Sequence, residues 1–200
     1  MKTILLVDDD PAIREIFTEF LETGGYRVFA VSGGLECLEL VKTTRPDLIL
    51  LDLMMEPMDG WETLLAIRRD TVTGQVPVIV VTGKKPEPAE IVQYGSMIED
   101  FIVKPVEFGT IIASLNHVIE KDLDLHREIE RLIRNNQDPA LLNEYAGLLR
   151  LVRITYHIKR RFKDHQFAER TLIRSKEKRL KLLHDQIGFP DRFLERDYRR

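Results

Sequence analysis

Carboxylates gather at two points of the sequence where a run of apolar residues ends. Residues 8–10 are all aspartate and follow the apolar residues 3–7, and Asp52 follows the apolar residues 48–51. An apolar run of this length predicts a buried strand, and in open α/β sheets the carboxyl ends of the strands are where ligands bind. We therefore interpret Asp52 as a chemical group and hypothesise that its carboxylate accepts a phosphoryl group.

Crowded carboxylates repel one another, and a bound hard cation with oxygen ligands is the usual resolution. Mg²⁺ suits Asp9, Asp52 and a backbone carbonyl just beyond Asp52, because it accepts one or two carboxylates together with phosphate oxygens. Two later strand ends carry Thr82 and Lys104, whose hydroxyl and ammonium groups would hold phosphoryl oxygens. Asp52 would then act as the nucleophile without a general base, since a carboxylate is already ionised at neutral pH.

The elements that position these residues alternate between two periodicities. Strands are predicted at residues 3–7, 26–31, 48–51, 77–82 and 98–103, with helices between them and a last helix at about 108–119. Strands that alternate with helices indicate parallel βαβ units, so we expect an α/β fold with a doubly wound, five-stranded parallel sheet. In the strand order 2-1-3-4-5, the first and third strands are neighbours, and the polar strand ends converge on one crevice.

Motifs at four of these strand ends resemble the receiver domain of two-component response regulators. The resemblance covers residues 1–121, and its motifs are Val7-Asp8-Asp9-Asp10-Pro11, Asp52 with Met55, Met58, Asp59 and Gly60, Thr82-Gly83, and Phe101-Ile102-Val103-Lys104-Pro105. It implies a flavodoxin-like fold and a phosphoacceptor switch that assists only its own phosphorylation and dephosphorylation, and is not otherwise an enzyme.

The resemblance also implies a metal site and a phosphodonor. By this resemblance, Asp52 accepts the phosphoryl group from a histidine kinase, and Asp8 and Asp9 hold Mg²⁺ together with Asp52. The backbone carbonyl of Met54 is the further metal ligand that it implies.

Four more residues take roles from the same resemblance. Thr82 and Lys104 contact the phosphoryl group, and Phe101 stands at the aromatic switch position. The peptide bond between Lys104 and Pro105 is expected to be cis.

The sequence departs from the receiver pattern in three places. Glu56 stands where the family commonly has proline, and Pro57 follows it, which predicts a reshaped turn with an extra carboxylate near the site. Phe101 lacks the hydroxyl of the frequent tyrosine, so we expect burial alone to drive its inward rotation on phosphorylation. Met54 and Lys84 cannot orient an attacking water as an amide and a carboxylate would, which predicts a long-lived phosphoryl-aspartate.

A second enzyme class shares part of this pattern. Asp8 and Asp10 after the first strand, with Thr82 and Lys104 later, also fit the haloacid-dehalogenase-like phosphotransferases, in which the first aspartate is the nucleophile. That alternative leaves Asp52 without a role and lacks a later acidic pair for the metal.

Composition divides the chain into an acidic and a basic part. Residues 1–120 hold 10 Lys+Arg and 20 Asp+Glu, and residues 121–200 hold 20 and 13, so the charges of −10 and +7 sum to the net −3. No apolar stretch approaches the roughly 18 residues of a membrane span, and we expect a cytoplasmic protein. The single cysteine, Cys37, excludes a disulfide framework.

Residues 122–200 form a predicted all-α extension with long apolar stripes. Asn135-Asn136-Gln137 interrupts the first helical stretch, Asp138-Pro139 starts the next, and the pattern ends at Gly188. The stripe residues are Leu141, Leu142, Tyr145, Leu148, Leu149, Val152, Tyr156, Ile173, Leu180 and Ile187. Such stripes need a partner, either each other in a hairpin or a second subunit in a coiled coil. We favour a homodimer.

The same extension is strongly basic between residues 150 and 181. Twelve Lys+Arg stand there against three acidic residues. DNA or RNA binding as a transcriptional output is one interpretation of this density; a solvated helix face or a docking surface for an acidic protein target are others.

Overall fold

The computed structural model describes residues 1–162 and 170–190, with the side chains of 120–124, 126, 159–162 and 170–173 left out of the description. Its elements in chain order are β1 (Thr3–Val7), α1 (Pro11–Thr23), β2 (Arg27–Val31), α2 (Gly34–Thr44), β3 (Leu48–Leu51), α3 (Gly60–Arg69), β4 (Val78–Thr82), α4 (Pro88–Tyr94), the 3₁₀ helix η1 (Gly95–Met97), β5 (Asp100–Val103), α5 (Phe108–Arg134), α6 (Pro139–Phe162) and α7 (Arg170–Ile187). They divide into two compact units, of which the first holds residues 1–85 and 98–119 and the second holds residues 86–97 and 120–200.

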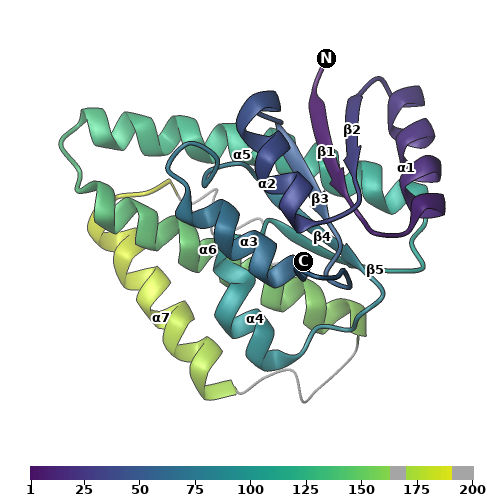
Figure 1. The fold of residues 1–200 in the computed structure, drawn as a ribbon. Coiled ribbons are helices and arrows are strands. Elements are labelled where there is room, and N and C mark those ends of the chain that lie inside the picture. The colour runs from purple at the N-terminus through teal and green to yellow at the C-terminus, as the bar shows by residue number, and fades with distance from the viewer. Residues whose placement is uncertain (163–169, 191–200) are drawn as a thin grey trace. The chain divides into compact units, whose positions relative to one another are not determined.

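The first unit is built on one parallel sheet. Its strand order is β2-β1-β3-β4-β5, which confirms the predicted doubly wound topology (Figure 1). The central pair, β1 and β3, places Val7 beside Leu51, so the residues that follow these two strands emerge next to each other. The sheet itself therefore brings Asp8 and Asp52 together.

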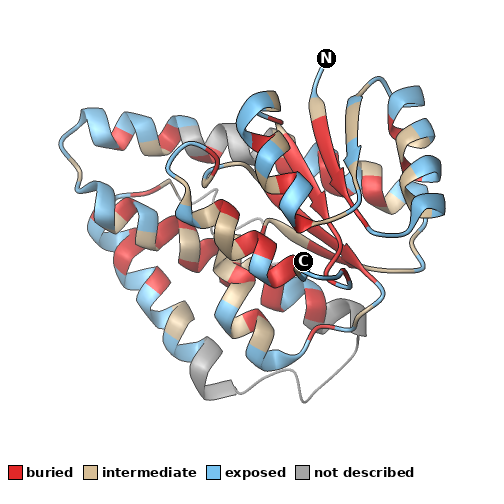
Figure 2. Ribbon diagram, viewed as in Figure 1, coloured by how far each residue is buried: buried red, intermediate tan, exposed pale blue. Residues whose placement is uncertain are grey.

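The inner strands β1, β3 and β4 are buried on both faces, as expected of a parallel sheet covered by helices, whereas the edge strand β2 is exposed or partly buried (Figure 2). On one face, alternate strand residues pack against α1 and the first part of α5. This cluster consists of Ile4, Leu6, Phe17, Leu21, Leu48, Leu50, Ile79, Val81, Ile102, Ile111, Leu115 and Val118. The core fixes the sheet, and the polar strand ends are held at its edge.

Capping residues set the helices that start beside the strand ends. Asp10, the residue before the first-turn proline of α1, accepts hydrogen bonds from the backbone N–H groups of Ala12 and Ile13. Asp59 and Glu62 form a reciprocal capping box at the start of α3. The aspartates at positions 10 and 59 are thus engaged in helix starts.

Gly60 allows α3 to begin against the backbone that carries Asp52. A Cβ added at Gly60 would lie 2.2 Å from the carbonyl oxygen of Asp52 and 2.7 Å from the Cα of Leu53. Both are backbone atoms, so no side chain can rotate away to make room.

We expect the substitution Gly60→Ala to lower the free energy of unfolding by about 3 kcal/mol, because overpacking against backbone forces α3 and the turn after Asp52 apart. Urea unfolding measures this. Gly33→Ala is the matched control, since nothing lies within 4 Å of its added Cβ, and a change within about 0.5 kcal/mol is expected there. Equal unfolding midpoints for the two variants would contradict the packing described.

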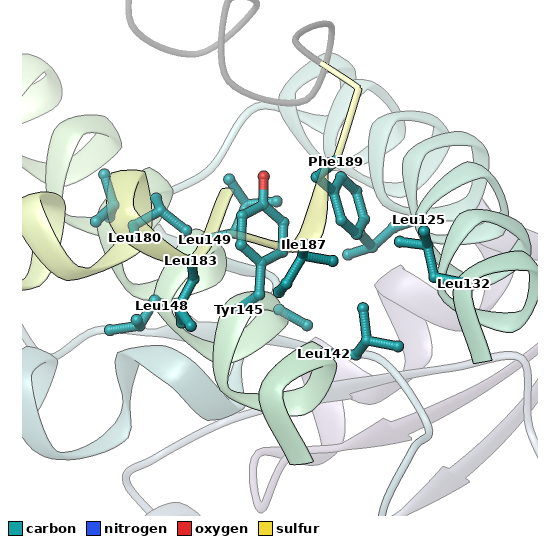
Figure 3. Close-up of a cluster of buried hydrophobic side chains, with 12 residues drawn as sticks. Leu125, Leu132, Leu142, Tyr145, Leu148, Leu149, Leu180, Leu183, Ile187 and Phe189 are labelled. Atoms are coloured by element: carbon teal, nitrogen blue, oxygen red, sulfur yellow. The ribbon is translucent and has the colours of Figure 1, made fainter. Parts of the chain in front are cut away.

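The second unit contains α4, η1, the part of α5 from residue 120 onward, α6 and α7. Buried side chains converge in it from α5, α6 and α7 (Figure 3). The cluster consists of Leu125, Leu132, Leu142, Tyr145, Ala146, Leu148, Leu149, Val152, Leu180, Leu183, Ile187 and Phe189. The stripes of α6 and α7 therefore pack against each other within one chain, which is the hairpin alternative.

Tyr156, another of the stripe residues, is not part of this cluster. Tyr156 is 38% exposed, and its hydroxyl donates a hydrogen bond to Glu177, so it belongs to the rim of the helix pair. The side chain of Ile173 lies outside the described residues.

The predicted helix ends of this unit are confirmed. α5 ends at Arg134 and is followed by Asn136 in the left-handed conformation, with φ 63°. α6 begins at Pro139 after Asp138, and α7 ends at Ile187 before Gly188, with φ 69°. Among the described residues, none of the helices combines the length and apolar character that crossing a membrane requires.

Candidate phosphoacceptor site

Three charged side chains from different strand ends meet at one point. Asp8 and Asp52 are only 2% and 6% exposed. The Nζ of Lys104, beyond β5, lies 2.5 Å from Oδ2 of Asp8 and 2.7 Å from Oδ2 of Asp52. One ammonium group thus bridges two buried carboxylates that are far apart in the sequence.

Asp9 adds a third carboxylate to this point. It is exposed, and one oxygen from each of Asp8, Asp9 and Asp52 can be chosen so that all three lie within 4.8 Å of one another. Three converging carboxylate oxygens, two of them buried, fit a hard cation such as Mg²⁺. Such an ion would offset the charge of the carboxylates and of an incoming phosphoryl group.

Burial acts on the two buried carboxylates with different outcomes. Burial raises the pKa of Asp8, and the hydrogen bond from Lys104 offsets this only in part. Burial also acts to raise the pKa of Asp52, but hydrogen bonds from Lys104, the Met54 N–H and Thr82 outweigh it, so this pKa is lowered. Asp52 is therefore the better stabilised anion, as its proposed role as nucleophile requires.

The ammonium group of Lys104 is stabilised in the same way. Burial acts to lower its pKa, but the hydrogen bonds and charges of Asp52 and Asp8 outweigh burial and raise it. Lys104 thus stays charged. Its ammonium group is close enough to Asp52 to contact an oxygen of a phosphoryl group added there.

Thr82 ends β4 beside Asp52 and is fully buried. Its Oγ1 accepts a hydrogen bond from the backbone N–H of Lys84 at 3.3 Å, and its side chain hydrogen-bonds Asp52. The hydroxyl therefore links the acceptor carboxylate to the segment that leads into α4.

Phe101 differs from the expectation of an inward rotation. Its ring is 0% exposed, and its centroid lies 6.5 Å from that of Trp61 in a tilted arrangement. A ring that is already buried has no further burial to gain, so burial cannot drive a rotation inward. Trp61 of α3 is thus the aromatic neighbour of this position.

The turn after Asp52 contains the remaining predicted residues. The Met54 N–H donates to Oδ1 of Asp52 at 3.0 Å, and the Met54 side chain is 59% exposed. The role of its carbonyl as a metal ligand stays a prediction. Glu56 is exposed, and within the described residues it is not one of the carboxylates that gather for a metal. Both the Glu56–Pro57 and the Lys104–Pro105 peptide bonds are cis.

Arg14 is a site neighbour that the sequence did not indicate. Its Nη1 donates to the backbone carbonyl of Asp8 at 2.7 Å. The contact depends on α1 turning back over the end of β1, and a lone arginine in a helix gives no signal of it.

The fold and this site define a class, and comparison with known sequences identifies it: the chain belongs to the response regulator receiver family. The family model "Response regulator receiver domain" matches residues 4–116. The protein PilH of Pseudomonas aeruginosa is 30% identical over 119 residues, which are 60% of this chain and 98% of PilH. The transcriptional regulatory protein AfsQ1 of Streptomyces coelicolor is 36% identical over 121 residues, 60% of this chain and 52% of AfsQ1.

Solved structures agree with this assignment. The N-terminal domain of a response regulator receiver protein from Methanoculleus marisnigri is 49% identical with a TM-score of 0.51, over 59% of this chain and 96% of that one. The receiver domain of the sensor histidine kinase PA1611 from Pseudomonas aeruginosa, solved with magnesium in its active-site cleft, is 27% identical with a TM-score of 0.55, over 60% and 98%.

The similarity to known proteins covers only part of the chain. The chain spans about half the length of AfsQ1, and the family match ends at residue 116. The helices beyond it take no assignment from the match. Membership of the family argues against the haloacid-dehalogenase-like alternative, in which Asp8 would be the nucleophile.

Proposed function

We propose that the protein is a phosphorylation switch in which Asp52 accepts a phosphoryl group from a histidine kinase, with Mg²⁺ held by Asp8, Asp9 and Asp52. The observation that carries this proposal is the Lys104 bridge between two buried carboxylates at adjacent strand ends. Carboxylates on a solvated surface are stabilised by water and need no bridging cation. A site that receives an anionic group needs positive charge to hold that group.

In the transfer, one bond to phosphorus forms as another breaks. An Oδ atom of Asp52 forms a bond to phosphorus, the bond from phosphorus to the donor imidazole nitrogen breaks, and that nitrogen keeps the electron pair and takes up a proton. Lys104 can then hold a phosphoryl oxygen, and the Thr82 hydroxyl can hold another. The bound metal supplies charge neutralisation for the incoming and transferred phosphoryl group.

Incubation of the full chain with acetyl phosphate tests this proposal without knowledge of the kinase. Intact-mass measurement is expected to show the addition of one phosphoryl group with Mg²⁺ and none with excess EDTA. Incorporation that is equal in the two conditions would contradict a metal-assisted site.

An output through nucleic acid is a second candidate. Arg174, Lys178 and Lys181 lie exposed on α7 and, among the described residues, have no acidic partner. Their spacing of four and three residues places them on one helix face. A gel-shift assay with a salt series tests this, because binding through phosphates must weaken steeply as salt rises.

A homodimer through the C-terminal helices stays a prediction with less support. The stripes that suggested it are largely buried within the chain. Light scattering of the protein with and without phosphorylation measures the oligomeric state directly.

We expect the phosphoryl group on Asp52 to persist for minutes or longer. Met54 and Lys84 offer no amide or carboxylate to orient a water molecule for attack on phosphorus, and the exposed Met54 side chain stands next to the acceptor. Loss of phosphate after removal of the donor, followed by intact mass, measures the lifetime. The variant Met54→Asn should shorten it, whereas loss within seconds in the unmodified protein would contradict this expectation.

A further inference from the structure

Two elements of the family-matched segment pack with the C-terminal helices. Residues 86–97, which contain α4 and η1, group with residues 120–200 in the second unit. Ile91 of α4 is 1% exposed and Gly95 of η1 is buried, and residues of α6 lie against η1. Part of the receiver sequence therefore packs with the C-terminal helices in the second unit.

Small residues make this contact close. A Cβ added at Gly95 would lie 2.9 Å from Cδ1 of Leu151 and 3.8 Å from Cγ2 of Ile154, both buried residues of α6. On the facing side, a Cβ added at Gly147 would lie 3.7 Å from the Cβ of Ser96. We call this contact between η1 and α6 the glycine seat; it is formed by Gly95, Ser96, Gly147, Leu151 and Ile154.

The other end of α4 leads to the phosphoacceptor site. The Thr82 hydroxyl hydrogen-bonds Asp52 and accepts a hydrogen bond from the Lys84 N–H. Only residues 83–87 separate Thr82 from the first residue of α4. A phosphoryl oxygen on Asp52 would accept the hydroxyl proton in place of the carboxylate, and the movement of Oγ1 toward it would draw on the 3.3 Å hydrogen bond from the Lys84 N–H.

We propose that the glycine seat couples the two units: phosphorylation of Asp52 acts on α6 by shifting α4 and η1, and the seat in turn restrains the phosphorylation of Asp52. The coupling rests on the proposed function of Asp52. Its two directions belong together, because a free energy of coupling between two sites is reciprocal. The phosphoacceptor site and the glycine seat both affect the position of α4. The loop before α4 connects it to the phosphoacceptor site, and packing connects it to the glycine seat.

Hydrogen–deuterium exchange of the full chain tests the first direction. With Mg²⁺ and beryllofluoride as the phosphoryl mimic, we expect exchange to change by about threefold or more in residues 83–88 and in residues 145–158 of α6. In the variant Gly95→Ala, the response of residues 83–88 should persist and that of α6 should be lost. Gly109→Ala is the matched control, since nothing lies within 4 Å of its added Cβ.

The rate of phosphorylation by acetyl phosphate tests the second direction. Gly95→Ala should raise the rate about threefold or more over the Gly109→Ala control, because a displaced η1 no longer holds α4 in place. In a Leu151→Ala background, Gly95→Ala should raise the rate by less than about a third of that increase, because the leucine side chain that the added Cβ meets is absent.

The outcomes separate the coupling from the proposed function. If residues 83–88 of the unmodified chain respond to beryllofluoride and α6 does not, the coupling is overturned while Asp52 remains a phosphoacceptor; this comparison needs no variant to fold. An unchanged phosphorylation rate in a folded Gly95→Ala variant would also overturn it. A chain that neither binds beryllofluoride nor takes up phosphate would overturn the proposed function, and the coupling with it.

Discussion

Substitution of Asp52 by asparagine will reduce phosphate incorporation from acetyl phosphate to background, a loss of more than about a hundredfold. The amide keeps the size of the side chain but provides no anionic oxygen to attack phosphorus. Asp52 is also the buried carboxylate whose pKa is lowered by its hydrogen bonds, so its charge is maintained near neutral pH. Intact mass over a time course with Mg²⁺ measures the loss.

Asp10→Asn is the matched control for this substitution. Asp10 stands in the same acidic run as Asp8 and Asp9, but its carboxylate caps α1, and asparagine caps helices equally well. Incorporation should stay within about twofold of the unmodified protein, since the nucleophile is untouched. A similar loss in both variants would indicate that general acidity near β1, and not the carboxylate of Asp52, determines the reaction.

Substitution of Lys104 by methionine will have the largest effect on stability that we expect from the site. Lys104 is 19% exposed and bridges Asp8 and Asp52, so its loss leaves two buried carboxylates without their shared cation. Removal of one partner from a buried ion pair costs about 3 kcal/mol. Mg²⁺ should recover part of this loss, because it offers a new cation to the same oxygens. Urea unfolding at neutral pH, with and without Mg²⁺, measures both effects.

The stability loss should depend on pH in a defined direction. The lowered pKa of Asp52 in the folded protein contributes stability that is present above its unfolded pKa, near 4, and is lost as the pH falls through the folded value. The raised pKa of Asp8 acts in the opposite sense, since its burial favours the protonated form. Without Lys104 both carboxylates gain protons more readily, so the difference between the variant and the unmodified protein should shrink below about pH 4.

Lys2→Met is the control for this second prediction. Lys2 pairs with Asp47 at 2.7 Å, but its side chain is 44% exposed. An exposed pair contributes at most about 1 kcal/mol. Equal losses for Lys2→Met and Lys104→Met would show that burial does not distinguish the two pairs.

The receiver part of the fold follows from sequence patterns that act locally. Apolar strands, helix caps such as Asp10 and turn residues define each element, and parallel topology then brings Asp8, Asp52, Thr82 and Lys104 to one edge of the sheet. Each of these side chains stands directly after, or at the end of, a strand. The register of the sheet, with Val7 beside Leu51, is enough to place them together.

What could not be predicted depends on packing between distant segments. The burial of Phe101 near Trp61 requires the arrangement of α3 against β5, which no local pattern encodes. The apolar stripes of α6 and α7 are compatible with a hairpin or with a second subunit, and only the assembled side chains distinguish them. The association of α4 and η1 with α6 is signalled by two ordinary glycines, Gly95 and Gly147, whose meaning appears only when the helices are placed.

Chemical mapping of the phosphorylated residue tests the central claim most directly. After incubation with acetyl phosphate and Mg²⁺, borohydride reduction converts an acyl phosphate on aspartate into homoserine, which peptide mass spectrometry locates. We predict homoserine at position 52 and unmodified aspartate at positions 8, 9 and 10. Homoserine at position 8, or phosphate retained on a histidine, would contradict the assignment of Asp52 as the phosphoacceptor.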